Sequence, residues 1–497
     1  MSHPKQMLLT VLLLFPSLLG AQEEHSHGAA EKLGTVSFST SCLPEIQQQF
    51  DRGVALLHSF AYVAAGDAFR SVAERDPRCA MAHWGVAMTS FHQLWDPPVS
   101  PSTIPTAQRE LRAAQEAGGS TDRERGFINA LSLIYQDADS VAYRVRASNY
   151  GRAMKDLAGK NPKDTEVQVF YALALLANGS PTDKTHEKQK EAADVLEPLA
   201  RAFPEHPGIP HYLIHAYDNA ELASRGLPAA REYSKIAASA PHALHMPSHI
   251  FTRLGLWEDS IASNVAARDA AHRQGDTGEE LHAMDYLVYA YLQLGRDSEA
   301  AQIVEQLKGM KGLNIADSKS SYPTTAIPVR YVVERKQWAE AASIAPPTGT
   351  PPYVTAIAVW ARGLGLSRSG RSREAGMEAD RLRQIGTQLR AAGNDYWATE
   401  MDVMLREVLA WSAQADGKTE EAVAVMREAA DEEDATEKLP VTPGPIVPAR
   451  EQLADLLLEQ NHPGQASREF AGSLVNSPGR RGAVQGVARA AELSSHK

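Results

Sequence analysis

Helical periodicity runs through almost the whole chain and sets the class of fold that it can adopt. After Ser41, apolar residues recur at i, i+3, i+4 and i+7, and alternating β-type segments are hard to find. The periodic segments come in pairs joined by short turns, with an Ala early in the second helix, as at Gly255, Gly295, Gly370 and Gly417. Because such hairpins bury their apolar faces by stacking, the pattern predicts an all-α solenoid of helical hairpins.

The first hairpins resemble tetratricopeptide repeats (TPR), helix-turn-helix units of about 34 residues. The blocks that carry the resemblance are Phe50-Asp51-Arg52-Gly53, Ala68-Phe69, Asp76-Pro77 and Ala82-His83-Trp84-Gly85. The resemblance covers most of residues 42–495, although the turn glycines named above are spaced by 40, 75 and 47 residues. It implies a right-handed superhelix with a concave groove.

A second resemblance is to a family of exported bacterial TPR proteins. The matching blocks are Ser41-Cys42 with Val54–Phe60, Cys79–Gly85, Pro241–Trp257 and Pro440–Glu451. The resemblance spans almost the whole chain, and the histidine-containing blocks are its most specific part. It implies fold and export, and no reaction.

The N-terminus has the features of a secretory signal peptide. Lys5 supplies a positive charge, Leu8–Leu19 are apolar, and small residues end at Ala21. We therefore expect residues 1–21 to be removed, residues 22–41 to form a polar segment, and the mature protein to be periplasmic or secreted. The apolar run is too short to span about 30 Å of hydrocarbon, and no later run reaches the roughly eighteen apolar residues of a membrane helix.

The charge balance excludes two classes of partner. The chain has 50 Lys and Arg against 61 Asp and Glu, a net charge of -11, and no stretch is rich in basic residues. Nucleic acid and anionic membranes are therefore poor candidates. The sequence also lacks the zinc-protease, nucleophile-elbow, Cys-x-x-Cys and dinucleotide-binding signatures, so no common enzyme class is indicated.

Cys42 and Cys79 are the only cysteines in the chain. An exported protein meets an oxidising compartment, and both residues precede first helices of adjacent hairpins, where stacking brings helix starts together. We therefore predict a disulfide between them, with two buried thiols as the alternative.

Three proline-rich stretches are expected to separate the helical blocks, because proline lacks the N–H that a helix interior needs. They are Asp96–Pro105, Pro346–Pro352 and Pro440–Pro448. The expected divisions are N-terminal TPR-like hairpins at 42–100, a helical repeat segment at 101–205, histidine-rich repeats at 206–345, further repeats at 346–439, and a C-terminal hairpin with a capping helix at 440–497.

Histidines are clustered in the third of these divisions. Of the 17 histidines, six lie between residues 206 and 249. His211, His215 and Asp218 share one face of a helix by their spacing. The next first helix carries His242, His245 and His249 on one face by i, i+3, i+7 spacing.

The spacing between the two sets is one repeat. His211 and His245 are 34 residues apart, as are His215 and His249, so each pair occupies equivalent positions on adjacent first helices. Helices pack about 8 to 10 Å apart. Two imidazoles that reach toward each other across this distance can share a metal ion with bonds of about 2.0 to 2.1 Å. We therefore expect the pairs to be neighbours.

When the next hairpin is aligned by its turn glycine, His282 and Asp285 occupy positions equivalent to His242 and His245. A second pair with the 34-residue period is His58 and His92, near the ends of the first two first helices. The candidate metal ligands are His211, His215, Asp218, His242, His245, His249, His282 and Asp285.

Three interpretations of this cluster stay open at this point. The histidines could be hydrogen-bonded structural residues in a groove wall. They could bind a transition metal, zinc, copper or iron, through two to four imidazoles, with Asp218 or Asp285 as an oxygen ligand or an orienting partner. They could also recognise an anionic ligand or act in acid–base chemistry. Pro247 would kink a helix that runs on from Pro241.

Two functions are therefore expected from the sequence. The first is an exported scaffold that binds a peptide, a protein or another ligand in its concave groove. The alternative is a metalloprotein, with a metal-dependent hydrolase or oxidase as the enzyme classes. The sequence makes no prediction of the oligomeric state.

Overall fold

The computed structural model describes residues 31–95, 98–117 and 120–495. The predicted signal peptide, residues 1–21, lies outside this range and stays a prediction. Residues from Lys32 onward form one compact unit. Every regular element among the described residues is a helix, and none of these helices is long and apolar enough to cross a membrane.

The N-terminal part of the unit holds eight α-helices and two short 3₁₀ turns. They are η1 (Pro44–Ile46), α1 (Gln47–His58), α2 (Tyr62–Arg75), α3 (Ala80–Met88), η2 (Pro101–Thr103), α4 (Ile104–Glu116), α5 (Asp122–Tyr135), α6 (Tyr143–Lys160), α7 (Thr165–Ala177) and α8 (Glu187–Ala202).

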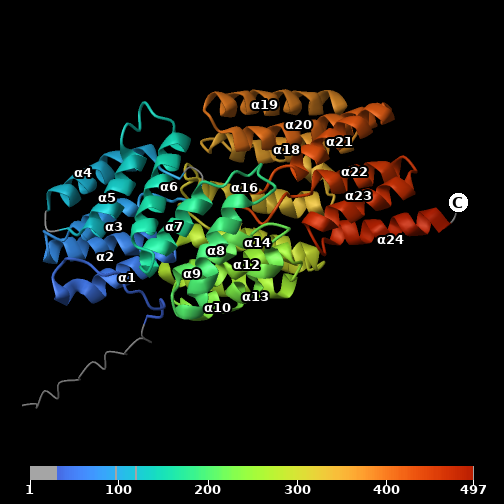
Figure 1. The fold of residues 1–497 in the computed structure, drawn as a ribbon. Helices are drawn as coiled ribbons and strands as arrows, with labels where there is room; N and C mark the ends of the chain where they lie inside the picture. Colours follow the sequence, from blue (N-terminus) through green and yellow to red (C-terminus); the bar gives the residue numbers. More distant parts are fainter. Residues whose placement is uncertain (1–30, 96–97, 118–119, 496–497) are drawn as a thin grey trace, which may run out of the picture. The chain divides into compact units, whose positions relative to one another are not determined.

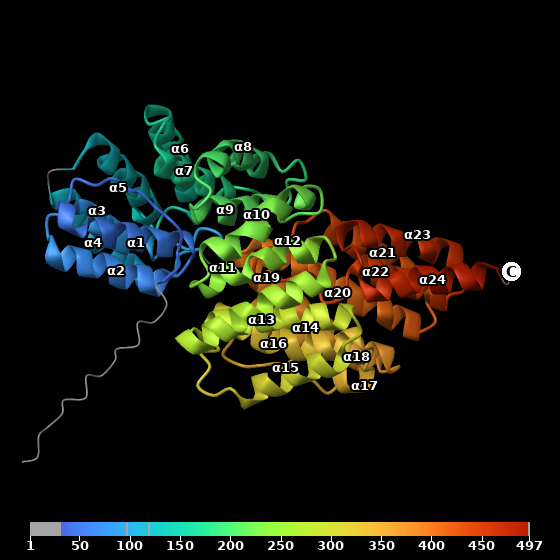
Figure 2. The ribbon, with the colours of Figure 1, turned by 90° about the horizontal axis from the view of Figure 1, so that it is seen from below.

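The middle part, coloured green to yellow in Figures 1 and 2, carries the histidine-rich helices. Its elements are α9 (Gly208–Tyr217), α10 (Ala223–Ile236), α11 (Pro241–His245), α12 (Pro247–Arg253), α13 (Trp257–Gln274), α14 (Thr277–Gln293), α15 (Asp297–Gly309), α16 (Ser318–Glu334) and α17 (Trp338–Ala341). In Figure 2 these helices lie between the blue N-terminal and the red C-terminal helices.

The C-terminal part completes the array. Its helices are α18 (Pro352–Arg368), α19 (Ser372–Ala391), α20 (Asp395–Ala415), α21 (Thr419–Asp434), α22 (Ala449–Glu459), α23 (Pro463–Asn476) and α24 (Arg481–Ser495). From α1 to α24, each helix packs against the next one along the chain (Figure 1). The fold is therefore all-α and TPR-like, which confirms the predicted class.

The predicted turn glycines occupy the turns between paired helices. Gly255, between α12 and α13, has a φ of 68°, which favours glycine. A Cβ at this position would also lie 2.5 Å from the carbonyl oxygen of Pro478. Gly295, Gly370 and Gly417 have φ values of 71°, 72° and 79°. Glycine thus allows the tight hairpin turns, and at Gly255 it also lets the chain approach the loop before α24.

The disulfide between Cys42 and Cys79 is present, with the two Cα atoms 4.7 Å apart. It joins the start of α1 to the start of α3, as the stacking argument predicted. The same link is reinforced by Asp76, whose carboxylate accepts the Leu43 N–H at 2.9 Å.

The expected polar N-terminal segment carries a core residue. Phe38 is fully buried. Its ring lies 5.4 Å from that of Phe50 and 5.2 Å from that of Phe127. Such aromatic pairs contribute about 0.5 to 1.5 kcal/mol each beyond the area they bury. The Thr35 N–H donates to the Glu205 carbonyl at 2.8 Å, so this segment also contacts the residue just before the histidine-rich region.

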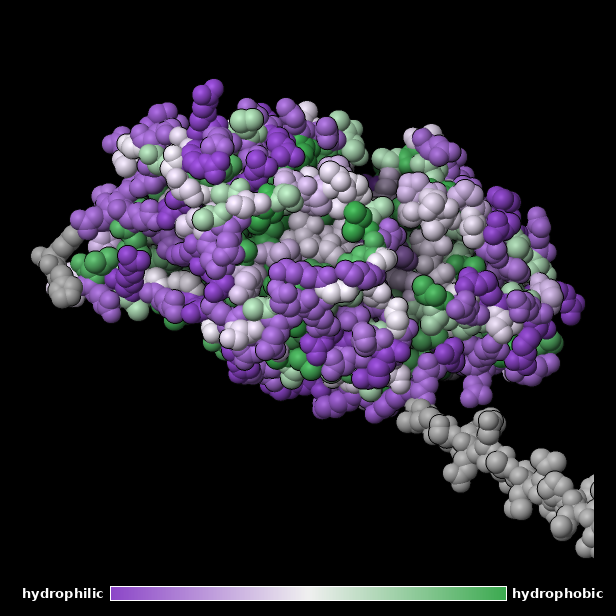
Figure 3. All heavy atoms as spheres, turned by 180° about the vertical axis from the view of Figure 1, so that it is seen from behind, coloured by the Kyte–Doolittle hydropathy of each residue, from purple (hydrophilic) through white to green (hydrophobic). Residues whose placement is uncertain are grey.

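Buried apolar residues form three clusters. One lies between Leu33 and Phe251, one between Trp257 and Ile327, and one between Tyr322 and Ala490. The surface shown in Figure 3 is mainly hydrophilic, with apolar residues scattered over it. The five divisions expected from the prolines stay predictions. The stretches 346–351 and 440–448 lie outside the α-helices, whereas Pro352 begins α18 and Pro105 lies in the first turn of α4. Residues 96–97 of the first stretch lie outside the described residues.

Candidate metal centre

Six histidines converge in the middle of the array. They come from the first helices of three successive hairpins, the second of which is divided into α11 and α12. They are His211 and His215 on α9, His242 and His245 on α11, His249 on α12, and His282 on α14. Five of them are buried, and His215 is partly buried. Asp276 caps the start of α14 by accepting the Glu279 N–H, which fixes the first turn of the helix that carries His282.

Pro247 shapes the central helix of the three. The helix that begins at Pro241 is interrupted at Met246, and α12 begins at Pro247. The kink expected from proline is therefore present. His245 and His249 still lie on one side of this bend, with their Nε2 atoms 3.0 Å apart.

The first cluster consists of His211, His215 and His242. The Nε2 atom of His211 lies 3.2 Å from the Nε2 atom of His215 and 3.2 Å from that of His242. One ligand atom from each of these residues fits within 4.8 Å of the others, so the three imidazoles could hold one ion.

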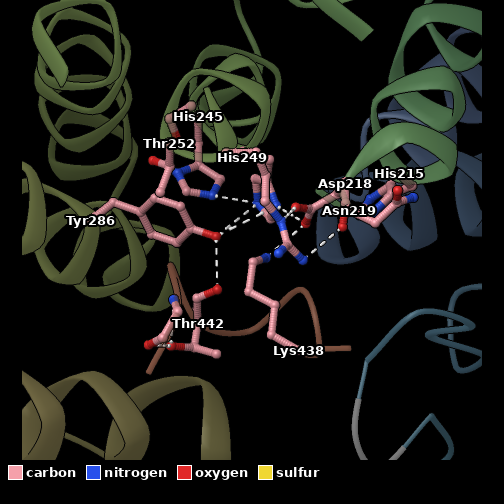
Figure 4. A network of polar contacts seen from close by, with 12 residues as sticks. His215, Asp218, Asn219, His245, His249, Thr252, Tyr286, Lys438 and Thr442 are labelled. Atoms are coloured by element: carbon pink, nitrogen blue, oxygen red, sulfur yellow. Dashed lines mark hydrogen bonds and ion pairs between the residues drawn. The ribbon is translucent and has the colours of Figure 1, made fainter. Parts of the chain in front are cut away.

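The second cluster consists of His245, His249 and His282, and its ligand atoms also lie within 4.8 Å of one another. The His245 and His282 rings have centroids 4.3 Å apart. The phenol of Tyr286 packs edge-on against His245 and donates its hydroxyl to the Thr442 carbonyl at 3.2 Å (Figure 4).

The two clusters are neighbours. The ring centroids of His215 and His249 are 6.0 Å apart, which confirms this predicted pair. His211 and His245 are connected through His242, whose ring centroid lies 5.0 Å from that of His211 and 6.1 Å from that of His245. The 34-residue spacing thus brings the two sets onto one face, and the array presents two triads side by side.

Two imidazoles are oriented by neutral acceptors. His211 donates its Nδ1–H to the His58 carbonyl at 2.6 Å. His245 donates its Nδ1–H to the Asn264 side-chain oxygen at 2.6 Å, and the amide of Asn264 is fixed in turn because its nitrogen donates to the Ser260 carbonyl. A neutral imidazole carries one proton, so both rings present an Nε2 lone pair to the interior.

Two further imidazoles are oriented by carboxylates. His242 donates its Nδ1–H to Glu279 at 3.2 Å, and His249 donates its Nδ1–H to Asp218 at 2.8 Å. Their Nε2 lone pairs also face inward. Each cluster therefore contains a pair of facing acceptors, His211 with His242 and His245 with His249. His215 Nδ1 is buried and has no hydrogen-bond partner among the described residues.

The interior of the site lowers the pKa of five of the six imidazoles and so favours their neutral form. Burial first, and the neighbouring histidines second, hold the pKa of His211, His215 and His245 well below the ordinary value of histidine. Burial lowers the pKa of His282 to about 3 and also lowers the pKa of His249, against the opposing effect of Asp218. Neutral imidazole is the form that binds a metal ion.

The two carboxylates beside the clusters are already paired with cations. Asp218 lies 2.9 Å from Arg253 and 2.8 Å from Lys438, and Glu279 lies 2.9 Å from Lys319. These cations contribute to holding the pKa of both carboxyl groups well below the ordinary range. Little negative charge is left over to offset a bound ion.

Apolar residues and a loop enclose the space between the clusters. The cavity is lined by Phe60, Leu94, Trp95, His215, His242, Met246, His249, His282, Pro440 and Val441. Pro440 and Val441 belong to residues 437–442, here called the strap, which lie between α21 and α22. The strap covers the histidines, so this face of the array is closed around the candidate site.

The two aspartates proposed as ligands have other positions. Asp218 orients His249, which is the second of the two roles expected for it. Asp285 does not join either histidine cluster: its Oδ1 accepts from Arg330 at 3.2 Å, and both side chains are buried. Asp285 is thus paired with a cation on α16, and the ligand role predicted for it stays a prediction.

His58 and His92 do not form a pair of this kind. His58 contacts Glu166 and the Tyr212 hydroxyl, each at 2.9 Å. His92 stacks on Tyr62, with centroids 4.0 Å apart, and its Nε2 lies 3.0 Å from the Thr89 carbonyl.

A third group of potential ligands, His58, Glu166 and His206, is a structural network. The Gly208 N–H donates to His206 Nδ1, so the imidazole proton is on Nε2 and is donated to Glu166 at 2.9 Å. A histidine that binds metal through Nε2 needs the opposite tautomer. This arrangement separates the third group from the two triads.

Sequence reasoning missed the partners that orient the site. Asn264 and Lys438 lie outside the histidine helix faces that the spacing defined, and Lys438 is 220 residues from Asp218. Asn264 is on the second helix of its hairpin, where small residues mark close packing. The one available signal was the position of Glu279 one turn before His282.

No protein-family model matches the chain, and no curated protein sequence matches it. Solved structures similar to it include the TPR domain of P58(IPK), with 12% identity over 91% of this chain and 99% of that chain and a TM-score of 0.21. Yeast Tom70 has 10% identity over 89% and 88%, with a TM-score of 0.30.

The human IFIT1 dimer with m7Gppp-AAAA has 11% identity over 84% of this chain and 90% of that chain, with a TM-score of 0.37. At these identities and TM-scores, no ligand or partner transfers to this chain.

Proposed function

We propose that this protein is a metalloprotein that binds two transition-metal ions, one at each histidine triad. The observation that carries the proposal is the pair of facing acceptors in each triad. The Nε2 atoms of His211 and His242 lie 3.2 Å apart, and those of His245 and His249 lie 3.0 Å apart, although all four rings have their proton on Nδ1. Two lone pairs at this distance repel each other unless a cation lies between them.

A metal ion satisfies this geometry better than a proton does. One proton bridges two nitrogens, whereas one ion accepts all three lone pairs of a triad. Lys438, Arg253 and Lys319 lie close to the site, and their charges disfavour imidazolium ions in a buried cluster. Orientation of a ligand histidine through its other nitrogen is also the usual arrangement in metal sites.

Copper is the ion that the donor set favours. Imidazole suits zinc, copper, iron and nickel, and affinity for divalent ions is highest for copper. The ligands are neutral, and the carboxylates behind them are paired with cations, so the site compensates little positive charge. The affinity order concerns the cupric ion, whereas the weak charge compensation favours the singly charged cuprous ion, so we propose that the site holds copper in both oxidation states. Three ligands per ion also leave a coordination position open for a small molecule.

Of the two reaction classes expected from the sequence, oxidation fits a copper pair, because two copper ions can exchange two electrons. We therefore propose a redox function for the enclosed site. Export to the periplasm or the medium is also proposed, and the Cys42–Cys79 disulfide supports it, because such bonds persist in oxidising compartments. Binding of a peptide or protein elsewhere on the array stays a prediction.

Metal content tests the proposal. The mature protein is stripped with a chelator, loaded with cuprous ion under nitrogen, desalted and analysed by mass spectrometry of the elements. We expect two copper ions per chain, and about one after His215→Ala or His249→Ala. His272→Ala is the matched control, since its side chain is 75% exposed and lies outside both triads.

A redox titration tests the proposed redox function. Copper-loaded protein that has been oxidised in air should take up two electrons per chain from dithionite. If the loaded protein binds two ions but takes up no electrons, the redox function is excluded. If no copper, zinc, nickel or iron is retained, the metalloprotein proposal fails.

A further inference from the structure

Asp218 connects a ligand histidine to the strap. One carboxylate oxygen of Asp218, Oδ2, accepts from His249 Nδ1 at 2.8 Å and from Lys438 Nζ at 2.8 Å. The other oxygen, Oδ1, accepts from Arg253 at 2.9 Å. The Asp218 side chain is 5% exposed, so these contacts replace most of its water.

Arg253 and Lys438 reach Asp218 from different parts of the fold. Arg253 ends α12, the helix that also carries His249, and it donates a second hydrogen bond to the Asp218 carbonyl at 2.9 Å. Its contact with Asp218 therefore joins two histidine-bearing helices, and the same guanidinium also pairs with Glu437 of the strap. Lys438 belongs to the strap, 220 residues from Asp218 in sequence, and its side chain is 8% exposed.

The residues after Lys438 cover the site. Pro440 and Val441 line the cavity together with His249 and His282. The strap is attached again at Thr442, whose carbonyl accepts the Tyr286 hydroxyl. One short segment, the strap, thus carries both the lysine that contacts Asp218 and the two residues that cover the histidines.

The strap also has an attachment on its outer side. Glu437 pairs with Lys184 and lies 3.3 Å from Arg253, and its N–H donates to the Pro181 carbonyl at 2.7 Å. Lys184 is 44% exposed, so its ion pair is screened by water and contributes little. The structure therefore offers two lysines that form contacts of the strap: Lys438, which belongs to it and is buried against Asp218, and Lys184, which pairs with its Glu437 at the surface.

We infer that Lys438 is a positioning residue of the second triad, which holds His249 in its metal-binding orientation through Asp218 and ties that orientation to closure of the strap. This inference rests on the proposed metal function. Lys438 fixes the Oδ2 atom that His249 donates to. Without Lys438, Asp218 keeps Arg253 but has one fewer fixed contact on that oxygen, and the imidazole is less restrained.

A purely structural salt bridge makes a different prediction. In that case loss of Lys438 would lower the unfolding midpoint and leave the properties of the bound metal unchanged. A positioning role predicts a change at the metal in protein that is still folded. The experiment therefore reads out the metal ion itself.

The test compares Lys438→Met, Lys438→Arg and Lys184→Met with the unchanged protein. Each is loaded with cobalt(II), whose visible absorption reports the geometry of its ligands, and the release of cobalt to a chelator is followed with time. Changes in groups that orient metal ligands typically cost about 10- to 100-fold in metal affinity. We expect one of the two ions in Lys438→Met to be released about 10- to 100-fold faster, with an altered absorption band.

Lys438→Arg should restore most of the difference, because it returns a cation to Asp218, and Lys184→Met should match the unchanged protein. The inference is overturned if the unchanged protein binds two cobalt ions and Lys438→Met binds and releases them identically. It is also overturned if Lys184→Met produces the same effect. If the unchanged protein binds no cobalt, copper or zinc, the proposed metal function fails first, and the inference fails with it.

Discussion

The Nε2 atoms of His245 and His249 face each other at 3.0 Å, while each ring donates its Nδ1–H in the opposite direction, to Asn264 and to Asp218. The two residues are four apart, so they lie on one side of the helix despite the interruption at Met246. The protein stabilises both rings in the tautomer that leaves their lone pairs directed at one point. That arrangement is costly in a buried site unless an ion occupies the point.

Replacing Asn264 tests whether orientation of His245 contributes to metal binding. In Asn264→Ala, His245 loses the acceptor of its Nδ1–H and the Ser260 carbonyl loses a donor. We expect copper affinity to fall by about 10- to 100-fold. The metal-free protein should lose about 1 to 3 kcal/mol of unfolding free energy, because buried polar groups are left without partners. Competition with a chelator of known affinity and urea unfolding measure the two effects.

His215 and His58 should respond differently to replacement by alanine in metal-free protein. His215 Nδ1 has no partner among the described residues, so His215→Ala should change the unfolding free energy by less than about 1 kcal/mol. His58 contacts Glu166 and Tyr212, and its loss removes one partner of a buried carboxylate. Breaking such a pair costs about 3 to 5 kcal/mol.

Urea unfolding of the chelator-treated variants checks this difference, with His92→Ala as a control in the same part of the fold. The metal must be removed first, since a bound ion stabilises the native state by mass action. If His215→Ala fails to fold without metal, His215 is a core residue and not a ligand.

The disulfide should contribute to stability. It closes a loop between residues 37 apart in sequence. For a loop of this size the chain-entropy model gives about 3 to 4 kcal/mol. We expect denatured, unreduced protein to show no free thiols, and Cys42→Ser with Cys79→Ser to unfold at lower urea concentration. Two free thiols per chain in a thiol titration would contradict the bond.

The free energy of unfolding should depend on pH through two buried glutamates that are far from the histidines in sequence. Glu400 on α20 and Glu433 on α21 line one cavity. Burial raises the pKa of Glu400 to about 7, and burial together with the charge of Glu400 raises that of Glu433 to about 8. The native state therefore holds protons that the unfolded chain releases in the ordinary glutamate range.

The sign follows from this difference in bound protons. The contribution of these groups is present below the unfolded pKa and is lost as pH rises through about 7 to 8. Glu400→Gln removes one titrating group, so its unfolding free energy should fall less than that of the unchanged protein between pH 5 and pH 8. Urea unfolding at both pH values measures this, and equal slopes for the two proteins would exclude the effect.

The sequence predicted the helix faces and their stacking but could not predict the orienting contacts. The 34-residue spacing was enough to bring His215 to His249, because equivalent positions in a repeat array are neighbours. Lys438 could not be found in this way, since its contact with Asp218 depends on the path of a non-helical segment. Asp285 shares a helix face with His282 by spacing, and only the structure shows that its Oδ1 accepts from Arg330 on α16.

The most direct test of the central claim is anomalous diffraction at the copper absorption edge from crystals of the copper-loaded protein. The account predicts two anomalous peaks, one bounded by the Nε2 atoms of His211 and His242 together with a nitrogen of His215, and one bounded by the Nε2 atoms of His245 and His249 together with a nitrogen of His282. A single peak at His58, Glu166 and His206, or no peak at either triad in protein that is folded and loaded, would contradict it.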